Sequence, residues 1–405
     1  MDFNDTPEEA AFRAEARAWL EKTLSPATRA AFSEDEPLKA AKAYQALKAG
    51  AGYAGLTWRK SVGGRELPPI FSVIFGQEEA RFQAPVGPFA IGLGMCIPTM
   101  IAFASEEQKK RYVAPALRGE EIWCQLFSEP SAGSDVAGLK TRAVRDGDDW
   151  VVNGQKVWTS GAHYSDYGIL LTRTNPEKEK HKGLTMFFLD LKSPGVEVRP
   201  IHQMSGGSNF NEVYFTDVRI PDAQRLGEVG DGWNVALVTL MNERLAVGGS
   251  NGPDYAEILE LARNTPAPAG RGSLLQDQAF REKLAAWYVS AEGYTLGKYR
   301  TMTALSKGQT PGPESSIGKI LNANRLQDLT SAAIEAEDHF GIISDPAISP
   351  EQAVFQASYM WAPGLRIAGG TDEILRNIIA ERVLGLPQDV RVDKGVAFKD
   401  LPTGR

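Results

Sequence analysis

Glu243 and Arg244 are the only charged residues in an otherwise apolar helical segment, residues 235–247, and are candidates for acid–base chemistry. Burial in apolar surroundings raises the pKa of a carboxylate, and such a carboxylate suits a general base in a dry pocket. Adjacent helical positions point about 100° apart, however, so the two charges could instead lie at the polar edge of the helix.

Two further stretches have the composition of a site for a flat or phosphorylated ligand. Residues 127–135, FSEPSAGSD, combine small residues, hydroxyls and glycine, which lets backbone N–H groups approach a phosphate or a planar ring. A polar interdomain linker has the same composition. Trp158, Thr159 and Ser160 could stack on and hydrogen-bond a heterocycle, or could belong to an ordinary β-face.

A glycine pair precedes a predicted helix at residues 369–373, Gly-Gly-Thr-Asp-Glu. Thr371 stands where a side chain caps the helix N-terminus. The backbone N–H groups at such a helix start can bind an anion or a polarised carbonyl.

Other motif matches lack the structural context that they require. Residues 50–55 fit GxGxxG, but a predicted helix precedes them instead of a strand, which favours a helix end and a turn. Residues 248–252 fit the GxSxG motif of serine hydrolases, with Ser250 as nucleophile and His339 as base, yet residues 234–247 also read as helix. A hydrolase using Ser250 remains our alternative from a different class. The four histidines lack metal-ligand spacing, so we predict no metal site.

The elements that must position these residues follow the order helical, β, helical. Capping signals at Thr6 and Ser105 and an Ala/Lys-rich segment ending at Gly50 make the first third helical. Residues 150–158 predict a hairpin that turns at Asn153-Gly154. Further strands are expected at 167–172, 184–191, 196–199 and 213–220, with a charged, exposed loop at 175–182, before the helical pattern returns at 233.

This order predicts an α+β multidomain protein with three domains. They are an N-terminal helical domain at 1–122, a middle β-barrel-like domain at 123–229 and a C-terminal helical domain at 230–405. The 405 residues are 42% hydrophobic and carry a net charge of −7, which argues against nucleic-acid and anionic-membrane binding. Two cysteines, no signal-like N-terminus and no long apolar run lead us to expect a cytoplasmic protein.

Three segments resemble signatures of the acyl-CoA dehydrogenase family, and the resemblance covers nearly the whole chain. They are FSEPSAGSDVAGLKT, VVNGQKVWTSG and RIAGGTDEILRNIIAERVLGLP. The resemblance implies the family's fold, a helical domain, a β-barrel-like domain and a C-terminal four-helix bundle. It also implies bound FAD, an acyl-CoA substrate and an electron-transferring flavoprotein as acceptor.

The resemblance further implies which residues form the site. The cofactor contacts would be Gln125, Phe127, Ser128, Gly133, Ser134, Trp158, Thr159, Ser160, Thr371 and Glu373, and the substrate contacts Ser134, Arg244 and Gly370. In the family reaction a glutamate removes the α-proton of the thioester while the β-hydrogen leaves as hydride to flavin N5, giving a trans-2-enoyl-CoA. The acyl chain must therefore lie between carboxylate and flavin.

The position of the base separates subgroups of this family. Many members carry the glutamate just before the Gly-Thr of the C-terminal signature, where this chain has Gly369. Isovaleryl- and long-chain-like members carry it on the earlier helix, which here is Glu243. Glu243 is therefore the candidate base both because it stands in an apolar helical segment and because of the resemblance. The backbone N–H of Gly369 would hydrogen-bond the thioester oxygen.

Two departures from the family pattern bear on assembly. No arginine stands at Asp277–Phe280, and Asp338–Ile342 replaces a Gln-x-x-Gly-Gly loop that grips FAD across a subunit interface. The resemblance implies a homotetramer, with a heterotetramer of the steroid side-chain type, in which this chain is the catalytic subunit, as the alternative. An acyl-CoA oxidase is a further alternative. Two glycines in Ile91–Pro98 suggest room for a wide or branched acyl group.

Overall fold

The computed structural model describes residues 4–25, 36–82, 84–247, 252–267, 272–309 and 312–402, apart from the side chains of 243–247. The chain divides into two compact units. One comprises Asn4–Gln203, Gly207–Ala246 and Asp389–Arg405, and the other comprises Met1–Phe3, Met204–Gly206 and Val247–Gln388.

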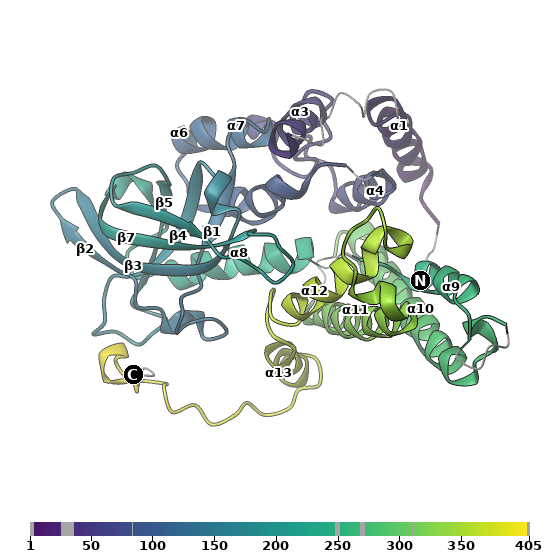
Figure 1. The fold of residues 1–405 in the computed structure, drawn as a ribbon. Coiled ribbons are helices and arrows are strands. Elements are labelled where there is room, and N and C mark those ends of the chain that lie inside the picture. Colours follow the sequence, from purple (N-terminus) through teal and green to yellow (C-terminus); the bar gives the residue numbers. More distant parts are fainter. Residues whose placement is uncertain are drawn as a thin grey trace. The chain divides into compact units, whose positions relative to one another are not determined.

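The first unit begins with helices, as the sequence predicts (Figure 1). They are α1 (Pro7–Thr23), α3 (Pro37–Gly50), α4 (Pro69–Glu79), α5 (Ile97–Phe103), α6 (Glu106–Gln108) and α7 (Ala114–Leu117). The capping signals at Thr6 and Ser105 are confirmed as capping boxes. Each cap side chain accepts from the backbone N–H of the third helical residue, and that residue's side chain accepts from the backbone N–H of the cap. Two π-helical turns, Gly92–Cys96 and Lys109–Val113, interrupt the later helices.

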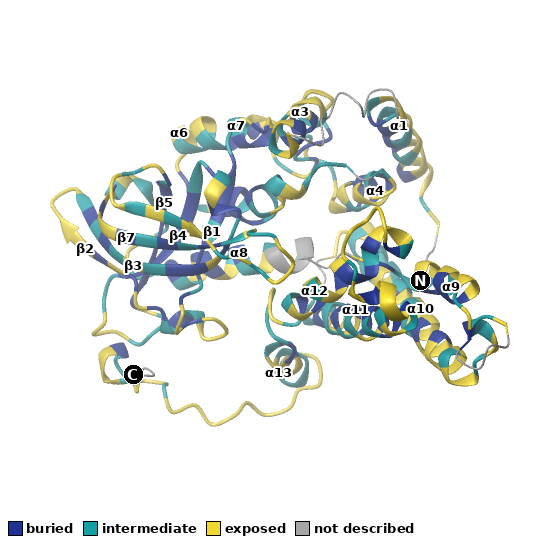
Figure 2. Cartoon of the chain, in the orientation of Figure 1, coloured by how far each residue is buried: buried dark blue, intermediate teal, exposed yellow. Residues whose placement is uncertain are grey.

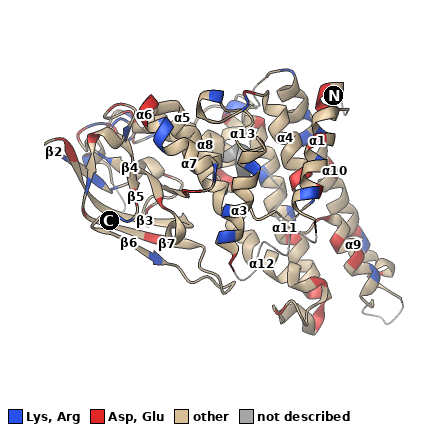
Figure 3. Ribbon diagram, turned by 90° about the horizontal axis from the view of Figure 1, so that it is seen from above, with Lys and Arg blue, Asp and Glu red and all other residues tan. Residues whose placement is uncertain are grey.

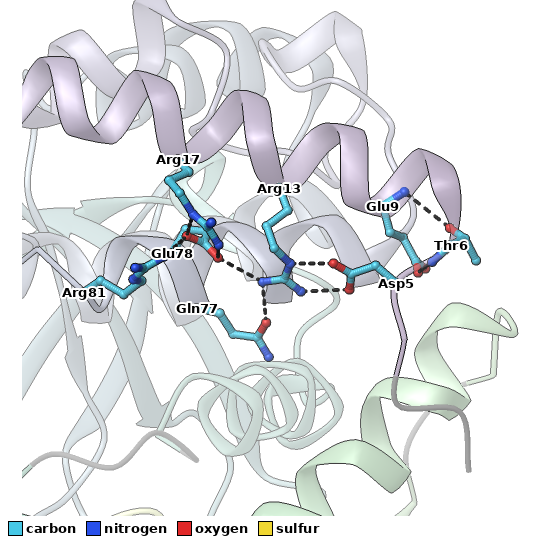
Figure 4. A network of polar contacts seen from close by, with 8 residues as sticks. All are labelled: Asp5, Thr6, Glu9, Arg13, Arg17, Gln77, Glu78 and Arg81. Atoms are coloured by element: carbon cyan, nitrogen blue, oxygen red, sulfur yellow. Dashed lines mark hydrogen bonds and ion pairs between the residues drawn. The ribbon is translucent and has the colours of Figure 1, made fainter.

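An ion-pair network joins α1 to α4 (Figure 4). The carboxylate of Glu78, which is 4% exposed, accepts from Arg17 at 2.9 Å, Arg13 at 3.2 Å and Arg81 at 2.9 Å. Arg13 also binds Asp5, which precedes α1. The guanidinium of Arg17 lowers the pKa of Glu78 to about 2, with Arg13 and Arg81 acting in the same direction against the effect of burial.

The middle of the chain forms one eight-stranded sheet in the order β6-β7-β3-β2-β4-β5-β8, with β1 paired to β4 (Figure 1). The strands are β1 (Trp123–Leu126), β2 (Arg142–Asp146), β3 (Asp149–Ser160), β4 (Tyr167–Arg173), β5 (Leu184–Asp190), β6 (Val196–Pro200), β7 (Phe210–Pro221) and β8 (Arg225–Leu226). The expectation of a helical, β, helical order is confirmed, and the strands predicted from 167, 184, 196 and 213 are present.

The predicted hairpin at Asn153-Gly154 is wrong, because β3 runs straight through it. The chain reverses earlier, between β2 and β3, where Asp146 pairs with Asp149. At Asn153 the partner strand β7 carries one extra residue, and Asn153 exchanges hydrogen bonds with Asp217 across the sheet. Gly154 is required there because a Cβ would meet the Thr141 hydroxyl at 2.5 Å. The Asn-Gly pair marks a β-bulge instead of a turn.

Both faces of the central strands are buried (Figure 2). Ile169 and Leu171 of β4 face a core shared with α5 and with α8 (Gly232–Val247), which includes Met100 and Val235. Leu170 between them faces a second core within the sheet. Strands covered on both sides read as continuous apolar runs, as β4 and β5 do.

The second unit is helical. Its helices are α9 (Tyr255–Asn264), α10 (Gln278–Ser306), α11 (Ser316–Ala336), α12 (Val354–Leu365) and α13 (Asp372–Arg382). Leu284 and Trp287 of α10, Leu329 of α11 and Phe355 of α12 form its core. Among the residues described, no helix is long and apolar enough to cross a membrane.

Charged side chains of both signs are interspersed over the sheet of the first unit (Figure 3).

The loop at 175–182, which we expected to be an exposed charged loop, is only partly exposed. The side chain of Lys180 is 12% exposed, because residues of the chain's last segment, 389–402, lie against it. That contact joins segments far apart in sequence, so local composition could not indicate it.

Replacing Glu78 by glutamine should lower the free energy of unfolding by about 2–3 kcal/mol, because three guanidinium groups lose their shared charged acceptor. The folded-state pKa of Glu78 is lowered, so its contribution is complete above pH 4.5 and is lost as the pH falls from 4.5 to about 2. Urea unfolding of Glu78→Gln and wild type at several pH values checks this.

Glu106→Gln is the matched control, since Glu106 is an exposed acceptor for Lys109 and should change stability by less than about 0.5 kcal/mol. Equal unfolding midpoints for Glu78→Gln and wild type at pH 7 would contradict the role of the network.

Candidate functional site

A buried lysine lies at the centre of the candidate site. Lys156 of β3 is fully buried, and its Nζ donates to the Glu129 carboxylate and to the Phe127 carbonyl oxygen, each at 2.9 Å. An ammonium group without solvent is costly unless a carboxylate pairs with it and its donors are satisfied. The position of Lys156 therefore dictates where the loop after β1 must run.

Glu129 fastens both ends of that loop. Its carboxylate also accepts from the backbone N–H groups of Lys140 at 2.6 Å and Thr141 at 2.9 Å, while Glu129 and Ala132 close a tight turn by two backbone bonds. Burial raises the pKa of Glu129, but the Lys156 ammonium and the hydrogen bonds outweigh burial and hold the pKa below its ordinary value. One carboxylate thus defines residues 129–141 as a closed loop, called here the 129–141 loop.

The pair brings together two of the predicted site segments. Val157 N–H donates to the Ser128 carbonyl oxygen at 2.9 Å, so the end of β3 lies beside the start of the 129–141 loop. Of the predicted residues, Phe127 is buried in the core, Gln125, Ser128 and Ser160 are half-buried, and Gly133 and Ser134 are exposed on the loop. The structure places these six in one unit.

Trp158 and Thr159 sit on a second β-bulge, where β3 carries one extra residue opposite β7. The bulge gives Trp158 a left-handed backbone with φ 59° and leaves its indole 59% exposed. Thr159 is 2% exposed, and its Oγ1 is buried without a hydrogen-bond partner among the described residues. Asn211 Nδ2 donates to the Thr159 carbonyl oxygen at 2.9 Å and holds the bulge in place.

Such a bulge stores strain that surrounding contacts must support. A buried hydroxyl without a partner is also costly unless a ligand supplies one. An open aromatic face next to an unsatisfied buried hydroxyl is therefore suited to a planar heterocycle with hydrogen-bonding atoms.

The helix that carries Glu243 and Arg244 is α8. The structure describes its backbone through Val247, whereas the side chains of Glu243 and Arg244 lie outside the described part. One turn before Glu243, the Thr239 hydroxyl bonds the Thr99 hydroxyl of α5 at 2.8 Å, and both residues are fully buried. This polar contact fixes α8 against α5 within the first unit.

The glycine pair and helix start at 369–373 belong to the second unit. Gly369 and Gly370 have φ values of 68° and 93°, and Thr371 Oγ1 accepts from Ile374 N–H at 3.3 Å, so the predicted N-cap is confirmed. Lys319 Nζ donates to the Gly370 carbonyl oxygen at 2.7 Å. Glu373 is exposed on the first turn.

A buried aspartate supports this helix start. Asp372 is 1% exposed and accepts from Arg366 at 2.8 Å and from Asn324 at 3.2 Å. These contacts hold the loop that presents Gly369 and Gly370.

Both departures from the family pattern fall on ordered elements. Asp277 accepts from Phe280 N–H at 2.7 Å and caps α10. Asp338–Ile342 form a short 3₁₀ turn in which Asp338 has φ 51° and Ile342 is 88% exposed. Asp338 and His339 pair with each other on the surface, while Ser250 lies outside the described residues. Within the described ranges no group of three or more His, Cys, Asp or Glu residues could hold a metal ion.

Sequence reasoning missed Glu129, Lys156 and Asp372 as the groups that hold the site. The alternation of β3 did offer a signal for Lys156. It places this side chain on the inward face of the strand, and a buried lysine needs an acidic partner. Nothing in the local sequence indicates which carboxylate that partner is.

Three family models match this chain. They are the acyl-CoA dehydrogenase N-terminal domain over residues 6–120, the middle domain over 124–218 and the C-terminal domain over 230–384. The chain is 36% identical over 393 residues to acyl-CoA dehydrogenase IpdE1 of Mycobacterium tuberculosis, covering 94% of this chain and 98% of that protein. It is also 36% identical to acyl-CoA dehydrogenase FadE34 of the same organism over 367 residues, 90% of this chain, but spans only 49% of that relative's length.

Two solved structures are similar over almost the whole chain. The ChsE4-ChsE5 complex of Mycobacterium tuberculosis has a chain with a TM-score of 0.80 and 29% identity, covering 96% of this chain and 100% of that one. The Tcur3481-Tcur3483 steroid ACAD has the same TM-score at 25% identity and the same coverage.

Lys156→Met should lower the free energy of unfolding by about 3–5 kcal/mol, because Glu129 would remain buried without its countercharge. Adding Glu129→Gln should restore part of the loss, since the amide is neutral and its oxygen can still accept from the loop. Denaturant unfolding of both variants checks this.

Lys192→Met is the control, because Lys192 is 77% exposed and should be near neutral. If Lys156→Met were as stable as wild type, the pair could not be what holds the 129–141 loop.

Proposed function

Because the chain belongs to the acyl-CoA dehydrogenase family, we propose that it is a flavoprotein that holds FAD and dehydrogenates an acyl-CoA thioester to a trans-2-enoyl-CoA. The observation that carries this proposal is the bulge in β3, where the exposed Trp158 indole is followed by the buried Thr159 hydroxyl, which has no hydrogen-bond partner among the described residues. Family members share the class of reaction, and the residue roles given below are specific to the proposal.

The residues of the first unit fit a flavin. Trp158 would lie against the ring system, Thr159 Oγ1 would hydrogen-bond an edge atom, and the backbone of the 129–141 loop near Ser134 would contact neighbouring parts of cofactor and substrate. Thr371 and Glu373 would supply further cofactor contacts, as the family resemblance implies. When bound, FAD supplies the acceptor for the β-hydride.

Glu243 is the proposed base. Its carboxylate would take the α-proton of the thioester, and the Gly369 backbone N–H would stabilise negative charge developing on the thioester oxygen. Two features support Glu243: position 369, where many relatives carry the glutamate, is glycine here, and the buried Thr99–Thr239 bond anchors α8 one turn before Glu243. Arg244 and Gly370 would contact the acyl-CoA.

The decisive experiment is the visible spectrum of the purified protein, followed by an anaerobic panel of acyl-CoA thioesters that includes straight-chain, branched and steroid side-chain examples. A flavin absorbance that one class of thioester bleaches supports the proposal and identifies the substrate class. Hydrogen peroxide formed in air would instead indicate an oxidase. A protein without bound or acquired FAD would overturn the proposal.

Glu243→Gln should retain FAD and acyl-CoA binding while lowering the rate of anaerobic flavin bleaching by at least about 1,000-fold, because the amide cannot accept the α-proton. Stopped-flow absorbance with the best thioester measures that rate. Glu228→Gln on the exposed segment before α8 is the control and should bleach at the wild-type rate. Bleaching by Glu243→Gln near the wild-type rate would refute the assignment.

Thr159→Val should weaken FAD binding about 10-fold without destabilising the cofactor-free protein, because valine removes a hydroxyl that has no partner within the described protein. Thr172→Val is the matched control: its buried hydroxyl donates to the Thr185 carbonyl oxygen, so it should lower stability and leave FAD affinity unchanged. FAD titration and thermal unfolding distinguish the two. Unchanged FAD affinity in Thr159→Val would contradict the proposed contact.

A second candidate is the catalytic subunit of a heteromeric enzyme. It is favoured by the 3₁₀ turn at Asp338–Ile342, which replaces the family's interface loop, and by similarity to a chain of a two-protein complex. Native mass measurement of the protein separates the candidates, because an active homotetramer would exclude the need for an unlike subunit. An electron-transferring flavoprotein is the proposed acceptor in either assembly.

A further inference from the structure

The last part of the chain, 389–402, folds back onto the sheet-containing unit and is called here the tail. Most of its residues are exposed (Figure 2), but Phe398 is buried. Phe398 N–H donates to the Lys178 carbonyl oxygen at 2.8 Å, and Lys399 N–H donates to the Pro176 carbonyl oxygen at 3.1 Å. The tail is therefore attached by backbone bonds to the loop between β4 and β5.

Phe398 covers a guanidinium that holds the 129–141 loop. The Arg173 carbon Cζ lies 3.6 Å from the centre of the Phe398 ring. Arg173 is 4% exposed and donates to the carbonyl oxygens of Ala137 at 2.6 Å and Lys180 at 2.7 Å. Covering this cation with an aromatic face compensates part of its lost hydration. The ring thus stabilises the residue that fixes the later half of the loop.

Lys180 forms a second connection between the tail and the 129–141 loop. Its Nζ contacts both oxygens of Asp135, at 2.9 and 3.0 Å, and an oxygen of Asp393 in the tail at 2.7 Å. Arg391 binds Asp393 as well, at 2.9 Å. The side chains of Lys180 and Asp393 are 12% and 17% exposed, so the tail end of the bridge is shielded, whereas Asp135 at the loop end is 63% exposed.

The loop tip between these anchors has few contacts of its own. Gly133 and Ser134 are exposed, and a Cβ placed on Gly133 would meet nothing within 4 Å. The tip lies between the Glu129–Ala132 turn and Asp135. Its position is therefore set by the turn and the buried Ala132 on one side, and by the Lys180 bridge and the buried Ala137 on the other.

We propose that the tail is a strap that positions the 129–141 loop, with Lys180 as the positioning residue that transmits its hold to Asp135 and hence to Ser134. The consequence for cofactor and acyl-CoA affinity rests on the proposed function, whereas the hold on the loop does not. Loosening the strap should weaken ligand binding and leave the chemical step nearly unchanged, because neither Lys180 nor any residue of the tail is among those proposed to take part in the chemistry.

The test uses full-length Lys180→Met and Phe398→Ala, with Lys182→Met as the matched control. Lys182 is a neighbouring lysine, 69% exposed, that pairs only with Glu179 among the ion pairs of the described residues. Hydrogen exchange of the amides of residues 131–139 should accelerate about 10-fold in both strap variants and stay at the wild-type rate in Lys182→Met. Lys180→Arg keeps the charge and should restore most of the protection.

Ligand measurements complete the test. The FAD dissociation constant and the KM for the best acyl-CoA should each rise about 5- to 10-fold in Lys180→Met, while kcat changes less than about twofold. Wild-type exchange rates at 131–139 in both strap variants would overturn the strap. Accelerated exchange in a protein that binds no FAD would uphold the strap and refute the proposed function, so the two failures are distinguishable.

Discussion

The ammonium group of Lys156 has no access to solvent, and the loop that contains the proposed site depends on how this buried charge is paired. The cost of a buried cation is recovered only if a carboxylate comes to it and every polar atom of the pair finds a partner. Glu129 meets this demand and, in doing so, also accepts from the backbone at Lys140 and Thr141. The ion pair and apolar packing together set the path of the 129–141 loop, since Ala132, Ala137 and Leu139 are buried in the core while Glu129 holds both ends.

The same strand that buries Lys156 exposes Trp158 two residues later. Regular alternation would place these two side chains on the same face. The extra residue in β3 breaks the alternation, turns the indole outward and leaves the Thr159 hydroxyl inward, with no hydrogen-bond partner in the part of the chain that the structure describes. Strain and an unsatisfied polar atom, each unfavourable in isolation, occur together at the point where the proposed cofactor would contribute both stacking and a hydrogen bond.

Polar contacts between distant segments recur wherever the proposed site needs rigidity. Arg173 and Lys180 connect the loop after β4 to the 129–141 loop and to the tail, Thr99 and Thr239 connect α5 to α8, and Asp372 orders the turn that holds Gly369. Each contact fixes the position of a loop or of a helix, because directional hydrogen bonds specify a position more narrowly than apolar packing does. The apolar cores hold the elements together, and these polar contacts fix the positions of the segments that form the proposed site.

The sequence alone determined the elements whose signals lie within a few consecutive residues. The capping residues Thr6, Ser105 and Thr371 and the apolar runs of β4 and β5 form the elements that the sequence predicts, because each signal lies within a few residues along the chain. Only the tertiary structure decided that Asn153-Gly154 is a bulge, that Lys156 is buried against Glu129 and that Lys180 lies beneath the tail. Those outcomes depend on strands and segments many residues away, whose pairing is set by the register of the whole sheet and by the cost of leaving a charge unpaired.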